Sequence, residues 1–185
     1  VVELPFNDKN YSVSHPALNL DETRIYFASD MPGTFGKSDL WYVDILGNGE
    51  YGVPVNLGAK INTRARETFP FISENNNLYY SSDGRGGNGG LDVYIAPLDE
   101  NGEVDVISNF GAPVNTNQDD FGFIIEESKG IGFFTSNFNG GRGSIDDDIY
   151  RFKEVCVITI NGTVTDMDTG VLLPGAEVSY LDKNN

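Results

Sequence analysis

The chain has 185 residues, of which 39% are hydrophobic and 12% aromatic, enough to build the core of one or two domains. Its formal net charge of −16 disfavours binding to nucleic acid or to an anionic lipid surface. No apolar run approaches the roughly 18 residues of a membrane-spanning helix, so direct membrane insertion is not predicted. The chain starts with Val instead of Met, so we expect a mature or excised fragment. The single cysteine, Cys156, cannot form an internal disulfide, and its apolar neighbours predict a buried thiol.

Short strands separated by turns are predicted along most of the chain, because Gly, Tyr and Phe are abundant and no window has a helical period. Val1–Leu4 is predicted to be the first strand. The clearest later predictions are Phe69–Ser73, Leu78–Ser82, Asp92–Pro97 and Val104–Ser108, followed by Phe121–Glu126, Gly132–Ser136 and Asp148–Phe152.

The strand pattern repeats. Ser29, Ser82 and Ser136 each end a predicted strand, at intervals of 53 and 54 residues. Independently, the segment 56–63 (NLGAKINT) matches 109–116 (NFGAPVNT), and residues 1–7 look like the tail of an earlier copy. A period of this size predicts a repeat architecture, with repeats at about 8–60, 61–114 and 115–153.

The repeated residues resemble those of TolB-type β-propeller repeats. The first copy carries the pattern on Pro16, Ile25, Tyr26, Phe27, Ser29, Asp30, Asp39, Leu40 and Trp41, and the second on Pro70, Ser82, Asp83, Asp92 and Tyr94. The third copy departs from it, with Gly122 in place of the proline and Asn137 in place of the first aspartate. The resemblance implies an all-β fold in which residues 1–153 form three four-stranded blades.

Closure of the blades leads to a further expectation. Propellers usually have four to eight blades, so we expect a larger disc, of six blades, with the others upstream. Val1–Leu4 would then be the outer strand of the preceding blade, and the outer strand of the third repeat would come from further upstream. The isolated chain would expose two raw blade faces and should aggregate or pair with itself.

Residues 154–185 follow a different pattern. Gly162, Val164 and Asp166, then the predicted turns Asp168–Gly170 and Leu173–Ala176, resemble the start of a carboxypeptidase-regulatory-like β-sandwich. Strands are predicted at Val157–Asp166 and Glu177–Leu181. Two strands cannot form an independent sandwich, so this domain is expected to be truncated here.

Enzyme activity is not predicted. His15 is the only histidine, and aligning Pro16, Pro70 and Gly122 places it where Phe69 and Phe121 stand, which indicates a packing position. No nucleophile-elbow motif accompanies it. Gly36-Lys37-Ser38 imitates the end of a phosphate-binding loop, but the upstream glycine of that motif is replaced by Met31 and a strand follows.

Aspartates gather near the glycine-rich loops, where carboxylates could bind Ca²⁺. No EF-hand spacing occurs, and Asp39, Asp92 and Asp148 share one position just before a strand. We expect them to accept hydrogen bonds from loop N–H groups, and therefore predict no cofactor, with Ca²⁺ as the alternative.

Three long loops, Met31–Ser38, Gly84–Leu91 and Phe138–Asp147, predict a binding face, because recognition residues often lie on long loops of a rigid scaffold. The alternative is that their glycines only make them disordered. The candidate interaction residues are Asp30, Lys37, Arg85, Asn88, Arg142 and Asp146.

A TolB-like propeller leading into a regulatory-like sandwich resembles large cell-envelope proteins of the Bacteroidota that end in an OmpA-like domain, some similar to the PorE component of type IX secretion. This resemblance implies a non-catalytic scaffold, periplasmic or outer-membrane-associated, whose partners are other envelope proteins. Peptidoglycan would be bound only through domains outside this chain. The alternatives are a secreted glycan-binding propeller and the propeller of a peptidase, and the downstream sandwich pattern argues against the latter.

Overall fold

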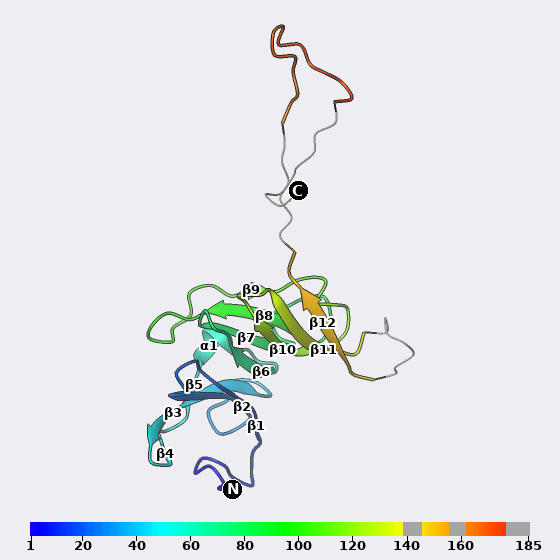
Figure 1. Ribbon diagram of the computed structural model, residues 1–185. Coiled ribbons are helices and arrows are strands. Elements are labelled where there is room, and N and C mark those ends of the chain that lie inside the picture. The colour runs from blue at the N-terminus through cyan, green and yellow to red at the C-terminus, as the bar shows by residue number, and fades with distance from the viewer. Residues whose placement is uncertain (139–145, 156–161, 177–185) are drawn as a thin grey trace. The chain divides into compact units, whose positions relative to one another are not determined.

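The computed structural model describes residues 1–138, 146–155 and 162–176, and within these ranges it is all-β apart from one helix of four residues, α1 (Gly58–Ile61) (Figure 1). The predicted all-β fold class is therefore confirmed. In the same ranges no helix is long and apolar enough to cross a membrane. The chain divides into two compact units, Val1–Glu154 and Val155–Asn185, and each is described by itself.

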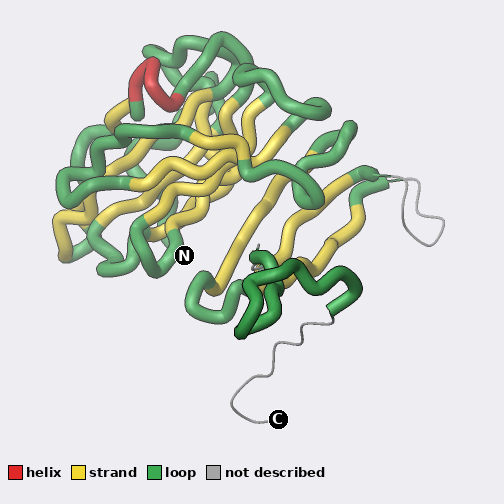
Figure 2. Tube along the Cα trace, turned by 90° about the horizontal axis from the view of Figure 1, so that it is seen from above, coloured by secondary structure: helices red, strands yellow, loops and turns green. Residues whose placement is uncertain are grey.

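The first unit contains three antiparallel sheets, whose strands run across the unit with loops gathered at their ends (Figure 2). The first sheet consists of β1 (Val13–Leu18), β2 (Arg24–Ser29), β3 (Asp39–Gly47), β4 (Glu50–Tyr51) and β5 (Val55–Asn56). The second consists of β6 (Glu67–Ile72), β7 (Asn77–Ser82), β8 (Asp92–Pro97) and β9 (Ser108–Asn109). The third consists of β10 (Asp120–Glu126), β11 (Ile131–Ser136) and β12 (Asp148–Lys153).

Most predicted strands of the second and third sheets are confirmed to within about two residues, but two predictions are wrong. In the segment predicted as the strand Val104–Ser108, Val104 makes only a single bridge to Leu98. The strand that pairs with the free edge of β8 is the short Ser108–Asn109. Val1–Leu4 forms no strand, because no neighbouring strand pairs with it in the described part of the chain.

The first strand of each sheet, β1, β6 or β10, contains a β-bulge at the same place. The pairing shifts register at His15, Phe69 and Gly122, and all three residues have positive φ, at 55°, 50° and 63°. The predicted alignment of the third copy was therefore wrong by one residue, because Gly122 and not Phe121 corresponds to His15. Glycine reaches this left-handed conformation without the steric cost that His15 and Phe69 carry.

The core consists of three clusters of buried apolar residues. One lies between the first and second sheets and includes Leu40, Ile61 and Tyr80. Another lies between the second and third sheets. The last packs the first sheet against the N-terminal segment, where the ring of Phe6 stacks on Phe27 with centroids 5.0 Å apart. The sheets therefore pack face to face in chain order.

A buried asparagine ties each linker back to the sheet it has just left. In the first linker, the side chain of Asn62 accepts a hydrogen bond from Leu40 N–H (2.8 Å) and donates one to Leu40 C=O (2.9 Å). Asn115 makes the same two bonds to Val93, at 2.8 and 2.9 Å. We call this arrangement the asparagine latch. It satisfies the N–H groups of Leu40 and Val93, which would otherwise be buried without partners.

In the second unit the described residues form a single bridge and two turns. Thr165 pairs with Leu172, and the carboxylate of Asp166 accepts hydrogen bonds from the N–H groups of Asp168 and Thr169. The turns predicted for Asp168–Gly170 and Leu173–Ala176 are confirmed. Cys156, the first half of the strand predicted at Val157–Asp166 and the strand predicted at Glu177–Leu181 lie outside the described residues. In the described half of the first of these strands only Thr165 forms a bridge, so that part of the prediction is wrong.

Candidate functional site

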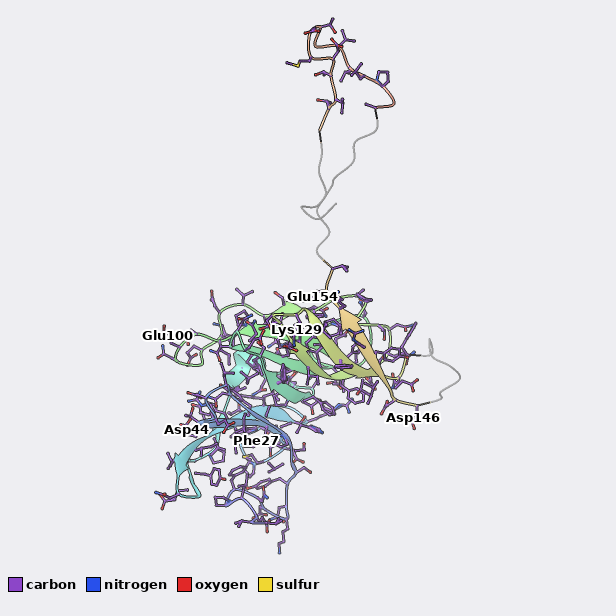
Figure 3. All side chains as sticks on the ribbon, in the orientation of Figure 1. Phe27, Asp44, Glu100, Lys129, Asp146 and Glu154 are labelled. Carbon is purple, nitrogen blue, oxygen red and sulfur yellow. The ribbon has the colours of Figure 1, made fainter. Side chains whose placement is uncertain are left out.

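The six candidate interaction residues are spread over three sheets. Asp30 and Lys37 lie in the β2–β3 loop, and Arg85 and Asn88 in the β7–β8 loop. Asp146 is exposed just before β12, far along the unit from Asp44 of the first sheet (Figure 3). Arg142 lies outside the described residues. Asp30 and Lys37 line the same pocket.

That pocket, of about 300 Å³, lies where the first and second sheets meet. We call it the polar pocket. Side-chain hydroxyls, charged groups and rings face it, and its lining includes Ser12, Ser14, His15, Ser29, Asp30, Lys37, Ser38, Arg66, Thr68 and Phe69. The sequence analysis missed Arg66 and Thr68. The available signal was their place at the start of the first strand of the second sheet, one repeat after Ser12 and Ser14.

His15 is held in this pocket by stacking and by hydroxyl contacts. Its ring lies 3.8 Å from that of Phe69, whose ring in turn lies 4.9 Å from that of Phe121. Its Nδ1 lies 2.8 Å from the Thr68 hydroxyl and 3.3 Å from that of Ser14. Burial lowers the pKa of His15 below its ordinary value, which favours the neutral ring. The geometry agrees with the predicted packing role.

Two of the charged groups of the polar pocket, Arg66 and Asp30, are bound by neighbouring groups. Arg66 forms a salt bridge to Asp83 at 2.9 Å, and its backbone N–H also donates to that carboxylate. Burial raises the pKa of Asp83, but the hydrogen bonds from Arg66 outweigh it and the charge of Lys37 adds to them, so the pKa is lowered. Asp30 accepts a hydrogen bond from Ser12 N–H at 2.6 Å. The side chain of Lys37 remains exposed to solvent.

The aspartates that the repeats share have structural roles. Asp39 accepts hydrogen bonds from the N–H groups of Phe35 and Gly36, and Asp92 accepts longer ones from Asn88 and Gly89. This confirms the role predicted for these two aspartates. Within the described ranges, no group of three or more His, Cys, Asp or Glu side chains could hold a metal ion.

A second polar residue, directly after the strand that ends in the repeated serine, has a similar structural role in each repeat. Asp30, Asp83 and Asn137 each accept a hydrogen bond from a backbone N–H just before the first strand of their sheet, at 2.6, 2.6 and 2.9 Å. The asparagine of the third copy keeps the interaction because an amide oxygen accepts as a carboxylate does.

The long loops also hold neighbouring sheets together. Lys37 N–H donates to Ala65 C=O at 2.7 Å, and Gly90 N–H donates to Gln118 C=O at 3.1 Å. Gly36 packs so closely on the following linker that a β-carbon there would collide with the Ala65 carbonyl. Gly36-Lys37-Ser38 is therefore a contact between sheets and not a phosphate loop.

Arg85 points inward from its loop. Its guanidinium donates to the carbonyls of Lys60 and Ile61, the latter at 2.8 Å, and lies 6.0 Å above the ring of Tyr80. It thereby caps the last carbonyls of α1.

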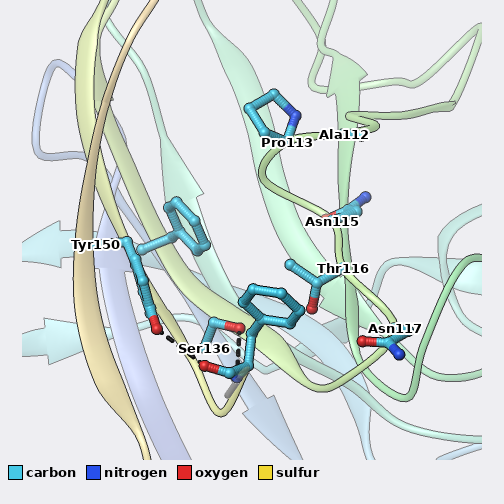
Figure 4. A pocket seen from close by; sticks show the side chains of 9 residues that line it. Ala112, Pro113, Asn115, Thr116, Asn117, Ser136 and Tyr150 are labelled. Carbon is cyan, nitrogen blue, oxygen red and sulfur yellow. Dashed lines mark hydrogen bonds between the residues drawn. The ribbon is translucent and has the colours of Figure 1, made fainter. Parts of the chain in front are cut away.

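The corresponding place beside the third sheet is an open, mainly apolar pocket of about 430 Å³ (Figure 4). Pro113, Phe134 and Tyr150 line it, and the Tyr150 hydroxyl donates to Phe138 C=O at 3.0 Å. Because Arg85 fills the equivalent place in the second sheet, we interpret this pocket as a packing position between linker and sheet.

No model of a known protein family matches this chain, and a search of curated proteins finds none with a similar sequence.

Proposed function

We propose that the chain is a non-catalytic interaction module, in which the three sheets are consecutive blades of a β-propeller that docks a protein partner. One observation carries the proposal. The polar residues that recur in every repeat, such as Asp39 and Asp92, are engaged in holding the sheets. Polar residues that differ between repeats, such as Lys37 and His15, face the polar pocket.

The polar pocket is suited to a protein surface that carries both positively and negatively charged side chains. It combines the exposed amine of Lys37 with the carboxylate of Asp30 and several hydroxyls on a rigid frame. Its volume of about 300 Å³ is at the lower end for small-molecule sites, so it fits a side chain or loop of a partner better than a cofactor.

Further parts of the proposal rest on resemblance to TolB-type repeats and Bacteroidota envelope proteins. These are a complete disc of six blades, a periplasmic or outer-membrane-associated location, and other envelope proteins as partners. A secreted carbohydrate-binding propeller is the second candidate, favoured by the hydroxyls of Ser12, Ser14 and Thr68 around the pocket.

The test is capture of proteins from an envelope extract by the immobilised chain. A specific partner should be retained by the unchanged chain and by Lys129→Glu, a variant in the β10–β11 turn, but lost with Lys37→Glu. Both variants change the net charge equally, so a loss in both would indicate non-specific electrostatics and count against the proposal. Binding on a glycan array that depends on Lys37 would support the carbohydrate alternative instead.

A further inference from the structure

One position of the repeat holds a pair of residues that face each other and differ in all three copies. The first residue lies directly before the first strand of its sheet, and the second lies directly after the strand that ends in the repeated serine. In each pair the backbone N–H of the first residue donates to the side chain of the second. The three pairs are Ser12 and Asp30, Arg66 and Asp83, and Asp119 and Asn137. They therefore differ in what their side chains add to a shared backbone arrangement.

In the second copy a guanidinium completes the pair. The Nε of Arg66 donates to Oδ2 of Asp83 at 2.9 Å, while its backbone N–H donates to Oδ1 at 2.6 Å, so both carboxylate oxygens have a partner. In the third copy no cation is needed at this position, because Asn137 carries an uncharged amide. The carboxylate is thus neutralised in one copy and replaced by an amide in another.

The first copy has the carboxylate without the guanidinium. Ser12 N–H donates to Oδ1 of Asp30 at 2.6 Å, but in the described part of the chain no side chain donates to this carboxylate and no cation forms a salt bridge with it. The side chain of Ser12 is too short to fill the place that an arginine side chain fills in the second copy. Ser12 and Asp30 both line the polar pocket, so this place is open.

We propose that the polar pocket binds an arginine side chain of the protein partner, whose guanidinium lies on Asp30 as that of Arg66 lies on Asp83. The inference deepens the proposed function and rests on it. A planar guanidinium presents several N–H donors that match a carboxylate, whereas an ammonium acts as a point charge. The pair in the second copy shows that this position of the repeat accommodates the guanidinium with the same backbone hydrogen bond in place.

Lys37 adds a second requirement. Its exposed side chain lines the same pocket, and among the described residues its ammonium forms no salt bridge or hydrogen bond. The corresponding residue of the second copy is Gly90, so the guanidinium of Arg66 has no such charge from its own copy beside it. An arginine entering the polar pocket would be repelled by Lys37 unless the partner also brings a carboxylate. The expected partner surface is therefore an arginine next to an acidic residue.

A purely anionic ligand fits the polar pocket less well. Lys37 and Arg66 both line the pocket, but Asp83 already neutralises the guanidinium of Arg66 at 2.9 Å. The carboxylate of Asp30 faces the same space and would repel an anion. The group in the pocket that lacks an opposite charge and has a precedent elsewhere in the chain is Asp30.

The first measurement adds blocked peptides of the form Gly-X-Glu-Gly, with Arg, Lys or Gln at X, to the full isotope-labelled chain. The amide proton of Ser12 reports on the site because it is hydrogen-bonded to Asp30, and that of Asp119 serves as the reference in the third copy. The Arg peptide should shift the Ser12 signal to saturation at about millimolar concentration, since exposed ion pairs are weak. The Lys peptide should bind at least about threefold more weakly. No saturable shift, or equal binding of the Arg peptide and either of the others, would overturn the proposal.

Asp30→Asn tests the carboxylate. The amide can still accept the hydrogen bond from Ser12 N–H, as Asn137 accepts one in the third copy, so the fold should be kept. Binding of the Arg peptide should weaken by about tenfold or more. Asp105→Asn, at an exposed side chain between β8 and β9, makes the same charge change and should bind as the unchanged chain does. Equal affinities of the two variants would contradict the proposal.

Lys37→Gln tests the acidic neighbour. The unchanged chain should prefer Gly-Arg-Glu-Gly to Gly-Arg-Gln-Gly by about threefold, because the glutamate offsets the charge of Lys37. In Lys37→Gln this preference should disappear. A preference of the same size in both chains would show that the glutamate does not act through Lys37, and the second requirement would fall.

Ser12→Arg supplies the guanidinium from the chain itself. The new side chain should take the place on Asp30, remove binding of the Arg peptide and raise the urea midpoint of unfolding. The rise should disappear when Asp30→Asn is also present, which separates a specific pair from the general benefit of a positive charge on a chain of net charge −16. Undiminished peptide binding by Ser12→Arg, or an equal midpoint shift in both backgrounds, would overturn the proposal.

The outcome can be separated from that of the proposed function. Peptide titration uses the purified chain alone, whereas the proposed function is tested by capture from an envelope extract. Peptide binding without capture would leave the arginine site standing and count against the proposed function. Capture that depends on Lys37 but not on Asp30 would leave the proposed function standing and overturn the arginine site.

Discussion

The asparagine latch allows a sharp prediction of stability at Asn115. Its side chain is 2% exposed and makes three hydrogen bonds, to Val93 N–H, Val93 C=O and the side chain of Asn109, at 2.8, 2.9 and 2.8 Å. Each bond contributes about 1 kcal/mol net. In Asn115→Ala the Val93 carbonyl and the Asn109 oxygen keep other partners, but the Val93 N–H is left unsatisfied at a cost of about 1 kcal/mol or more. The free energy of unfolding should therefore fall by about 4 kcal/mol.

The assay is urea unfolding, followed both by circular dichroism and by the fluorescence of Trp41, the single tryptophan. Trp41 lies in the first sheet and Asn115 ties the second, so coincident transitions would show that the sheets unfold as one cooperative unit. Protein concentration must be fixed, because self-association would add stability by mass action. The control is Asn117→Ala, an exposed asparagine two residues on, which should change the free energy by less than about 0.5 kcal/mol. A loss below about 1 kcal/mol for Asn115→Ala would refute the reasoning.

Three further predictions concern individual positions. Burial lowers the pKa of His15, so the unfolded chain binds its proton more readily and stability should fall as the pH drops through about 6.5. His15→Phe should remove this loss, and an equal effect of the substitution on the urea midpoint at pH 8 and pH 5 would contradict it. Gly122→Ala should cost only about 1 kcal/mol in urea, because this bulge holds larger residues at positive φ in the other two sheets, and a loss above about 3 kcal/mol would be inconsistent with that. Arg85→Ala should lower the free energy of unfolding by about 1–3 kcal/mol in thermal unfolding, because its hydrogen bonds to α1 are lost. The control Lys37→Ala, at an exposed side chain, should change it by close to nothing. Similar losses for the two variants would show that Arg85 does not support the helix.

The strands were predictable because their signal is local. Period-2 alternation and the recurring Ser29, Ser82 and Ser136 locate β2, β7 and β11 without any knowledge of distant contacts. The predicted strand Val104–Ser108 failed for the opposite reason. Pairing with β8 decides which residues of this segment are strand, and that pairing is not visible in the segment itself.

The third-copy bulge shows a different limit. Aligning Gly122 with Pro16 and Pro70 follows residue identity, yet the feature that the three copies share is a positive φ. Backbone conformation can be conserved between His15, Phe69 and Gly122 with no chemical similarity among their side chains. An alignment by residue type can therefore be wrong by one residue at such a position.

The candidate interaction residues show that loop position does not predict side-chain direction. Arg85 and Lys37 both lie in long glycine-rich loops, but Arg85 turns inward because two carbonyls of α1 are within reach of its guanidinium. Likewise, the repeated Asn62 and Asn115 were visible as a pattern. Their role depends on Leu40 and Val93, each 22 residues earlier, and only the fold brings them together.

The position of the latch along the chain has a consequence for synthesis and duplication. The first and second sheets are each completed by residues encoded after them, in the linker that leads to the next repeat. A nascent sheet emerging from the ribosome therefore waits for the following segment before its edge is closed. A duplication that inserts one whole period adds a sheet together with the latch for its neighbour. The array can therefore lengthen or shorten by whole periods without a new contact between linker and sheet having to evolve.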